Sequence, residues 1–310
     1  MVIHCDLQPP SEQIHDLVPW LEPAFREYVL HGGYGGYALP TSPWESERPG
    51  GSLDLTGVEY GIVTARDMLS VSAIPNRQLA SAIATAYNRR LVEEWLPSDA
   101  RLRGSLLVAP QEPEGAAAEI RRVGGHPGVV QVLVSLGAET GYGDGRYGAI
   151  WDACAEVGKP LALRAGAEGV GINAAPTATG YPATALELRT LLPGAAMSHL
   201  VSIVAHGVLE RAPETGVAIV GAGASWLPSL LDRFDANWRS LREEGTLEEL
   251  PSETVARRVR LTVEPLEDLL PIEPLTEMLM LGAPDLPAPS WGAGLFSENA
   301  RRFYGLPDAG

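Results

Sequence analysis

Several charged residues stand at the ends of short apolar runs, where side chains could take part in chemistry. Asp6, Arg164 and Glu264 each end or directly follow such a run, and Arg66 and Asp285 come within a few residues of one. A carboxylate can accept or give a proton as a general base or acid. A guanidinium keeps its positive charge and binds carboxylates through paired hydrogen bonds. Residues of these types, gathered in one pocket, could bind and transform a small organic acid.

The apolar runs alternate with longer segments of helical period, which is typical of parallel βα units. Most of the runs are dense in Val, Leu and Ile and few of them alternate with polar residues, as expected of strands buried on both faces. Eight strands with interleaved helices fit a closed barrel better than an open sheet. We therefore predict an α/β fold, a single (β/α)₈ TIM barrel over residues 1–310. The expected strands are Val2–Asp6, Val58–Thr64, Leu102–Ala109, Val129–Ser135, Pro160–Arg164, Val217–Val220, Val259–Val263 and Met278–Leu281.

The segment Gln78–Leu96 has the clearest helical pattern, because its apolar residues recur at every fourth position and form one stripe. Ser297 precedes Glu298 and is a plausible N-terminal cap for the last helix. The other expected helices are Glu114–Arg122, Arg146–Val157, Ala183–Leu192, Trp226–Leu241 and Ser297–Tyr304.

Two stretches interrupt this alternation. Gly32–Gly57 and Ala165–Pro182 are rich in Gly, Pro, Ser and Thr, and they also contain aromatic residues. Both follow the end of an expected strand, which is where active sites form in TIM barrels. We expect them to be loops at the mouth of the barrel, with ordinary surface loops as the alternative. Asn173 and Tyr181 lie in the second stretch, and either could line a substrate cavity or face solvent.

Charge and composition narrow the classes of partner. The net charge of −16 disfavours nucleic acid and anionic membranes, which bind basic surfaces. We expect no signal peptide, because the first residues lack a basic region and a long apolar run, and we expect no segment that spans a bilayer. Cys5 and Cys154 lie far apart and imply neither a disulfide framework nor a thiolate zinc site. We expect a cytoplasmic protein that acts on a small molecule.

Segments from the third strand to the last helix share their patterns with one family. They read YNRRL at 87–91 and RLRG at 101–104, RYGAIWD at 146–152 and GKPLAL at 158–163, GVLERAP at 207–213 and GASWLP at 223–228, and SENARRFYGL at 297–306. In order and spacing they resemble the amidohydrolase-related family, a branch of the amidohydrolase superfamily that includes decarboxylases and hydrolases. With the strand-one match discussed next, the resemblance covers essentially the whole chain and implies the TIM barrel fold.

The resemblance also implies a single divalent metal, zinc or manganese, at the mouth of the barrel. In the family, strand one supplies a His-x-His or acidic-x-His pair, strand five a His, strand six a His or Glu, and strand eight an Asp. At these positions the chain has Asp6 and Gln8, Arg164, Gly221 and Asp285. Only the two aspartates match, and an amide is a poor replacement for imidazole at a zinc site.

Arg164 is the departure with the clearest physical consequence. A guanidinium cannot coordinate a cation, and a metal beside it would face a like charge. We therefore predict that Arg164 replaces the metal as the positive charge and pairs with Asp6, Asp285 or both. On this interpretation no metal is bound, although zinc or manganese would be the cofactor if the family site were retained.

Further residues have both a functional and a structural interpretation. His206 could reach the pocket as an acid or base, as could His199, although such histidines are more often structural. Glu264 could face the pocket or solvent, and Arg66 could bind a substrate carboxylate or pair with the neighbouring Asp67. The glycines at 221 and 223 lack the further features of a nucleotide-binding loop, so we reject that function.

These observations predict a metal-independent enzyme that acts on a small organic acid, an aryl acid or an intermediate of specialised metabolism. Decarboxylation, lyase, hydrolase or cyclase chemistry would be within reach of the family. Arg164 would stabilise negative charge, and Asp6 and Asp285 would be the acid and base candidates. The expected substrate-binding residues are Gln8, Arg66, Asn173, His206 and Glu264. The alternatives are an inactive barrel that binds a ligand or partner, and a metal-dependent hydrolase or decarboxylase with unusual ligands. A homodimer is also possible.

Overall fold

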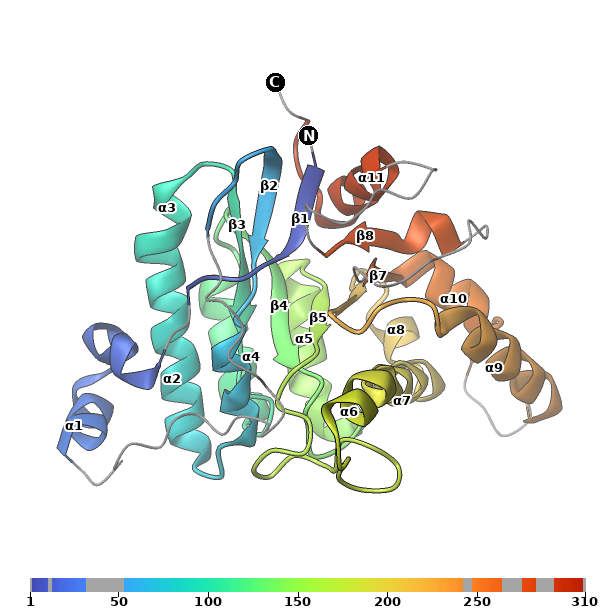
Figure 1. The fold of residues 1–310 in the computed structure, drawn as a ribbon, viewed down its shortest axis with the longest axis horizontal. Helices are drawn as coiled ribbons and strands as arrows, with labels where there is room; N and C mark the ends of the chain where they lie inside the picture. Colours follow the sequence, from blue (N-terminus) through green and yellow to red (C-terminus); the bar gives the residue numbers. More distant parts are fainter. Residues whose placement is uncertain are drawn as a thin grey trace.

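The fold is a barrel of parallel strands surrounded by helices (Figure 1). A computed structural model describes residues 2–10, 13–31, 53–241, 247–263, 275–282 and 293–308. The strands occur in the order of the sequence, and β8 packs beside β1, so the sheet curls into a nearly closed ring. They are β1 (Val2–Leu7), β2 (Val58–Val63), β3 (Leu102–Leu107), β4 (Val129–Ser135), β5 (Leu161–Arg164), β6 (Val217–Val220), β7 (Val259–Val263) and β8 (Leu279–Leu281). The predicted (β/α)₈ barrel is confirmed.

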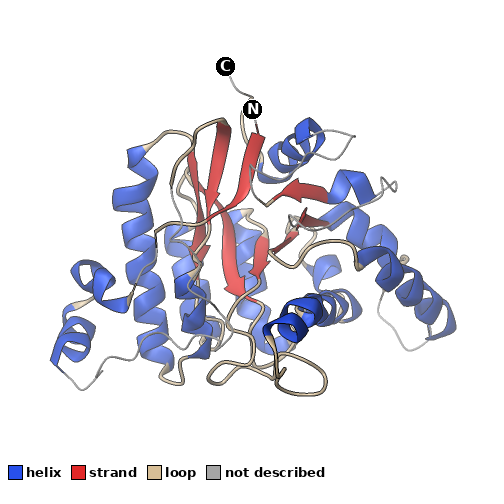
Figure 2. Cartoon of the chain, in the orientation of Figure 1, coloured by secondary structure: helices blue, strands red, loops and turns tan. Residues whose placement is uncertain are grey.

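Helices cover the outside of the barrel (Figure 2). The α-helices are α1 (Pro23–His31), α2 (Arg77–Arg90), α3 (Leu96–Ser98), α4 (Pro113–Val123), α5 (Gly148–Val157), α6 (Ala185–Leu191), α7 (Pro193–Ala205), α8 (Val208–Arg211), α9 (Leu227–Leu241), α10 (Pro251–Arg258) and α11 (Ala293–Tyr304). Short 3₁₀ segments are η1 (Ile14–Trp20), η2 (Asp67–Ala73), η4 (Gly145–Tyr147) and η5 (Leu275–Met278), and η3 (Leu91–Trp95) is a π-helical turn. The apolar stripe predicted for Gln78–Leu96 is the buried side of α2 and η3.

The last helix begins earlier than its sequence indicates. α11 starts at Ala293, so Ser297 lies inside the helix and is not its cap. Its hydroxyl instead accepts a hydrogen bond from the backbone N–H of Ile3 at 3.0 Å, which ties α11 to β1. Further along the same helix, the Tyr304 hydroxyl donates to the buried side chain of Gln131 at 2.9 Å. The C-terminal helix is therefore fastened to β1 and β4 through buried polar contacts.

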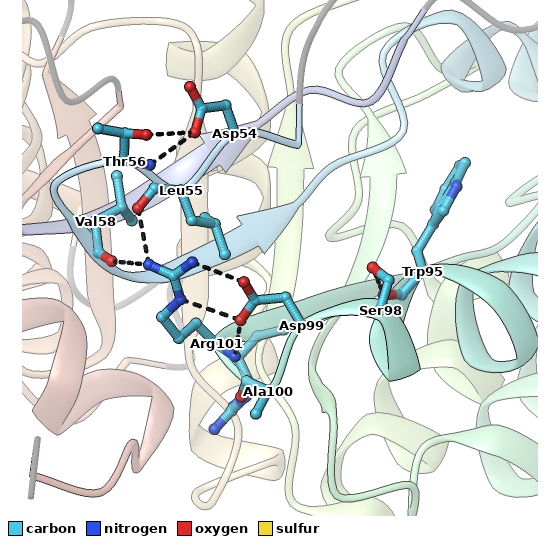
Figure 3. A network of polar contacts seen from close by, with 10 residues as sticks. Asp54, Leu55, Thr56, Val58, Trp95, Ser98, Asp99, Ala100 and Arg101 are labelled. Atoms are coloured by element: carbon cyan, nitrogen blue, oxygen red, sulfur yellow. Dashed lines mark hydrogen bonds and ion pairs between the residues drawn. The ribbon is translucent and has the colours of Figure 1, made fainter.

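The loops at the start of β2 and β3 are joined by Arg101 (Figure 3). Its guanidinium donates to the carbonyls of Leu55 at 2.9 Å and Val58 at 3.2 Å, and it pairs with Asp99 at 2.7 Å. These residues lie where the strands begin, at the end of the barrel opposite the mouth. Of the predicted mouth loop Gly32–Gly57, residues 32–52 lie outside the described part of the chain. The described remainder, 53–57, lies at the strand-start end, which corrects the prediction for those residues.

One helical stretch is longer and more apolar than the sequence analysis allowed. Ala185–Ala205, which comprises α6 and α7, is 21 residues long and contains an 18-residue window with a mean hydropathy of 1.3, enough by length and composition to cross a membrane. Of its most apolar 18-residue window, 28% is buried, and the buried residues of α7 include Ala196, Leu200 and Ile203. In this structure α7 packs against α9 and α10 in the outer helical layer of the barrel.

Candidate active site

Asp6 and Arg164 meet at the ends of β1 and β5, as predicted. The Arg164 Nε donates to one carboxylate oxygen of Asp6 at 2.7 Å, and its Nη2 donates to the other at 3.0 Å. Both side chains are mostly buried, with 7% of Arg164 and 11% of Asp6 exposed. The pair joins residues that are 158 positions apart in the chain, and its paired hydrogen bonds fix the orientation of the guanidinium.

Two more side chains hold the Asp6 carboxylate. The Thr64 hydroxyl, directly after β2, donates to Oδ1 at 2.5 Å, and the Gln8 amide donates to Oδ2 at 3.2 Å. With the two bonds from Arg164, the carboxylate accepts four hydrogen bonds. Gln8 was predicted to bind substrate, but in this structure its amide nitrogen supports Asp6. Thr64 was not identified from the sequence, because a threonine at the end of an apolar run looks like an ordinary strand residue.

The environment keeps Asp6 ionised. Burial by itself would raise the pKa of this carboxyl group, since a charged group is less stable away from water. The positive charge of Arg164 and the hydrogen bonds from Arg164, Thr64 and Gln8 outweigh burial, so the pKa of Asp6 lies below its ordinary value. A carboxylate with a lowered pKa and four donors is poorly suited to exchange protons near neutral pH. The geometry gives Asp6 the role of holding Arg164 in place.

A glycine directly follows β6, the strand that neighbours β5 and Arg164 in the barrel. Gly221 follows β6 with a backbone φ of +74°, and its N–H donates to the Thr262 hydroxyl of β7 at 2.9 Å. A Cβ atom added at this position would meet only Ala165, with the nearest atom at 3.5 Å. The position therefore has space for a side chain, although the left-handed backbone favours glycine there.

The loop after β5 is packed tightly against the end of β4. Ser135, which pairs with Arg164 across the two strands, donates to the carbonyl of Gly166 and accepts from the N–H of Gly137 at 2.8 Å. Gly137 has no room for a side chain, because a Cβ there would lie 2.2 Å from the Ala167 carbonyl oxygen. Ala167 itself has a φ of +60°, an uncommon conformation for a residue other than glycine. The loop predicted at Ala165–Pro182 thus begins as a rigid platform beside Arg164.

Asn173 is part of this platform. Its amide nitrogen donates to the Ala167 carbonyl at 2.8 Å and to the Ser72 hydroxyl at 3.1 Å, and the residue is only 6% exposed. Its amide oxygen is buried and has no hydrogen-bond partner. Asn173 therefore holds the loop against η2. The prediction that it lines an open substrate cavity is corrected, because its side chain is buried in these contacts. Tyr181, in the same loop, is 72% exposed.

The remaining predicted residues are dispersed. Arg66 lies directly before η2 and is 3.8 Å from Asp67, in line with the structural alternative for this residue. His206 is exposed at the C-terminal end of α7 and contacts the carbonyl of Ser202 at 2.8 Å. The helix precedes β6, so His206 lies at the strand-start end and not at the mouth, which corrects its predicted position. Glu264 and Asp285 lie outside the described residues.

His199 has the structural role that the sequence analysis favoured. Its Nδ1 accepts the backbone N–H of Tyr142 at 3.3 Å, and its Nε2 contacts the carbonyl of Leu136 at 2.8 Å. The imidazole also packs against the Tyr142 ring, with centroids 4.7 Å apart. Burial lowers the pKa of His199, although the contact with the Leu136 carbonyl acts in the opposite direction. A neutral imidazole therefore fastens the loop after β4 to α7.

The described residues do not form the metal site that the resemblance implies. Within the described ranges, no three His, Cys, Asp or Glu side chains lie close enough together to hold a metal ion. Asp6 is the one expected ligand among them, and its oxygens already accept hydrogen bonds from Arg164, Thr64 and Gln8. A divalent cation on this carboxylate would have to share it with a guanidinium, at a cost in electrostatic repulsion. The described side chains at the mouth of the barrel therefore do not fit a divalent metal ion.

Comparisons with known proteins agree with the fold and the resemblance. Residues 8–255 match the model of a family described as amidohydrolase. A comparison with curated protein sequences gave no match. Among solved structures, a 5-carboxyvanillate decarboxylase from Novosphingobium aromaticivorans, with bound manganese and 3-methoxy-4-hydroxy-5-nitrobenzoic acid, is 18% identical. The similarity covers 99% of this chain and 97% of that chain, with a TM-score of 0.70.

Two further decarboxylase structures are similar. A dihydroxybenzoic acid decarboxylase from Polaromonas sp. JS666, with manganese and the inhibitor 2-nitroresorcinol, is 15% identical, with a TM-score of 0.69 over 99% of this chain and 98% of that chain. A 2,6-dihydroxybenzoate decarboxylase from Rhizobium is 18% identical, with a TM-score of 0.64 over 81% of this chain and 85% of that chain. At these identities the likeness establishes the shared fold.

Proposed function

The chain belongs to the amidohydrolase family, and we propose that it is a metal-independent member that acts on a small aryl or organic acid, with decarboxylation as the leading reaction. The observation that carries the proposal is the paired contact between Arg164 and Asp6, which fixes the guanidinium of Arg164 at the mouth of the barrel. The similar decarboxylases act on or bind aromatic acids, and one of them binds a nitrophenol, which supports the choice of substrate class.

A positive charge held in a buried site is useful for this class of reaction. When an aryl carboxylate loses carbon dioxide, the electrons of the broken carbon–carbon bond remain on the ring and develop negative charge there. A fixed cation close to that charge lowers the barrier without having to reorganise during the reaction. Arg164 is held by Asp6 and also donates to the Ala165 carbonyl at 3.1 Å, so its guanidinium is already in place. Asp285 remains the proposed proton donor, and Asp6 acts through Arg164.

The engagement of Asp6 also supports the choice of reaction type. Hydrolysis of an amide or lactone requires an activated water, and Asp6 is engaged as the partner of Arg164 and has a lowered pKa. Decarboxylation, isomerisation and cyclisation depend more on charge stabilisation than on an activated water. We therefore rank decarboxylation ahead of hydrolysis for this protein.

The test is an activity screen of the purified protein in the presence and absence of EDTA. The screen includes 5-carboxyvanillate and 2,6-dihydroxybenzoate, and the release of carbon dioxide is measured. The proposal predicts turnover of an aryl acid that EDTA leaves unchanged and that Arg164→Lys reduces strongly. Activity that requires added manganese would overturn metal independence. Saturable binding of aryl acids without turnover of any of them would favour the inactive barrel.

A further inference from the structure

A second candidate site lies on the outside of the barrel, where η1 packs against α2 and α1 packs against η1; α1 and α2 are labelled in Figure 1. Two adjoining hollows of about 500 Å³ and about 430 Å³ share Trp20 and Glu22 in their walls. Arg26 and Arg89 line the first hollow, and Phe25 lines the second. The pair of hollows thus combines basic groups at one end with an aromatic wall on an outer face formed by helices, and neither Arg164 nor Asp6 lines them.

Both arginines are held in place by the backbone of η1. One terminal nitrogen of Arg26 donates to the carbonyls of Pro19 and Leu21, at 3.1 Å in each case. Arg89 donates to the carbonyl of Trp20 at 3.1 Å. A guanidinium fixed in this way loses less conformational freedom when it binds an anion, because part of its side chain is already ordered.

Although the chain as a whole is strongly acidic, few described carboxylates lie close to these two arginines. Among the described residues, no carboxylate lies within 4.0 Å of Arg26, and its Nε is buried without a hydrogen-bond acceptor. The carboxylate of Glu22 is 3.9 Å from Arg89, and the Glu22 side chain is 60% exposed. A buried N–H that finds no acceptor is costly, and such groups are rare unless a ligand or water completes them.

Trp20 supplies the apolar wall. The guanidinium carbon of Arg90 lies 5.1 Å from the centre of the Trp20 ring and 5.1 Å from that of Trp95, so Trp20 is supported from within the protein. Its ring lines both hollows. A flat apolar body could lie against this ring while its charged group reaches the arginines, which is how small-molecule sites commonly combine apolar contact with a few polar groups.

We propose that this hollow, bounded by Trp20, Arg26 and Arg89, binds a small organic anion. The carboxylate or phosphate of the ligand pairs with Arg26 and Arg89, and its apolar body packs on Trp20. The site is separate from the barrel mouth and does not depend on the reaction proposed there.

The experiment is isothermal titration of the full-length protein at low salt with two probes, benzoate and inorganic phosphate. The proposal predicts saturable binding of at least one probe. Arg26→Met and Arg89→Met should each weaken that binding by about tenfold or more. Arg121→Met is the control, because Arg121 is an exposed arginine that pairs with Glu156 elsewhere on the surface, and it should bind as the wild type does.

The probes separate the possible ligands. Binding of benzoate alone assigns the hollow to aryl carboxylates, and binding of phosphate alone assigns it to phosphate-bearing ligands. Arg26→Met removes two contacts to η1, so Arg89→Met and Trp20→Phe keep the test valid if the first variant does not fold. Failure of both probes to bind at millimolar concentrations would overturn the proposal, as would binding that both arginine substitutions leave unchanged. Binding that both arginine substitutions leave unchanged would place the probe elsewhere, including at the barrel mouth, whereas failure of both probes to bind says nothing about activity at the mouth.

Discussion

Arg164 contacts Asp6 side-on, with its Nε 2.7 Å from one carboxylate oxygen and its Nη2 3.0 Å from the other. The same side-on geometry occurs on the surface, where Arg121 Nε and Nη2 lie 2.6 Å and 2.9 Å from the two oxygens of Glu156. The two pairs differ in burial: 7% and 11% of the first pair is exposed, compared with 45% and 53% of the second. The chain thus provides its own control for the energetic effect of burying an ion pair.

The first prediction concerns the stability of the buried pair. Arg164→Met or Asp6→Leu alone should lower the free energy of unfolding by about 3–5 kcal/mol, because each leaves an uncompensated buried charge. The double variant should lose clearly less than the sum of the two. Arg121→Met on the surface should change stability by about 0–1 kcal/mol. Urea unfolding measures all four, and additive losses for Asp6 and Arg164 would show that the two are not coupled.

The second prediction concerns acid. The pKa of Asp6 is lowered from its ordinary value of 3.8, so the unfolded chain binds this proton more readily than the folded one. The stability that ionised Asp6 contributes is complete above the unfolded pKa and is lost as the pH falls through the folded pKa. The difference in unfolding free energy between the wild type and Asp6→Asn should therefore shrink as the pH is lowered below about 4. A difference that stays constant down to strongly acidic pH would contradict the lowered pKa.

The third prediction tests the platform beside Arg164. Gly137→Ala places a Cβ 2.2 Å from the Ala167 carbonyl oxygen, so the β5 loop must shift, at a cost of about 1–3 kcal/mol. Gly145→Ala is the matched control, because nothing lies within 4 Å of a Cβ there, and it should be neutral or slightly stabilising. Thermal unfolding distinguishes them. Equal melting temperatures for the two variants would mean that the contact between Gly137 and Ala167 is not tight in solution.

Much of this architecture was predictable because it depends on local pattern. The strands were found nearly to the residue, since β4 to β6 are continuous runs of buried, mostly apolar residues. The pairing of Asp6 with Arg164 followed from the resemblance combined with the rule that a buried charge needs a partner. Thr64 could not be found in this way, because its contact with Asp6 spans 58 residues and depends on the alignment of two strands.

The errors have equally specific causes. Ser297 has the residue type of a cap, but its hydroxyl bonds to Ile3 across 294 residues, a contact that no local pattern reveals. His206 has the residue type of an acid or base, but it caps α7 before β6 and so lies at the end of the barrel where the strands begin. α7 was missed as a separate helix because the expected segment Ala183–Leu192 ends where Pro193 opens the next one.

The fourth prediction asks whether the family's metal site can be restored. The triple change Gln8→His, Arg164→His and Gly221→His should give measurable zinc affinity, since imidazoles would then join Asp6 at the matched positions. There is space for a side chain at position 221. The left-handed backbone conformation there costs a residue other than glycine about 1–2 kcal/mol, although His tolerates this conformation better than most residues. Zinc titration of the variant and of the wild type measures the gain. A folded triple variant with no zinc affinity would show that these positions do not converge.

The most direct test of the account is a crystal structure of the wild-type protein soaked with manganese, with anomalous diffraction data collected at the manganese absorption edge. Manganese is the metal in similar decarboxylase structures. If Arg164 occupies the place of the cation, the contacts between Arg164 and Asp6 should be intact and no anomalous peak should lie at the barrel mouth. An anomalous peak coordinated by Asp6, with Arg164 turned away from it, would contradict the central claim.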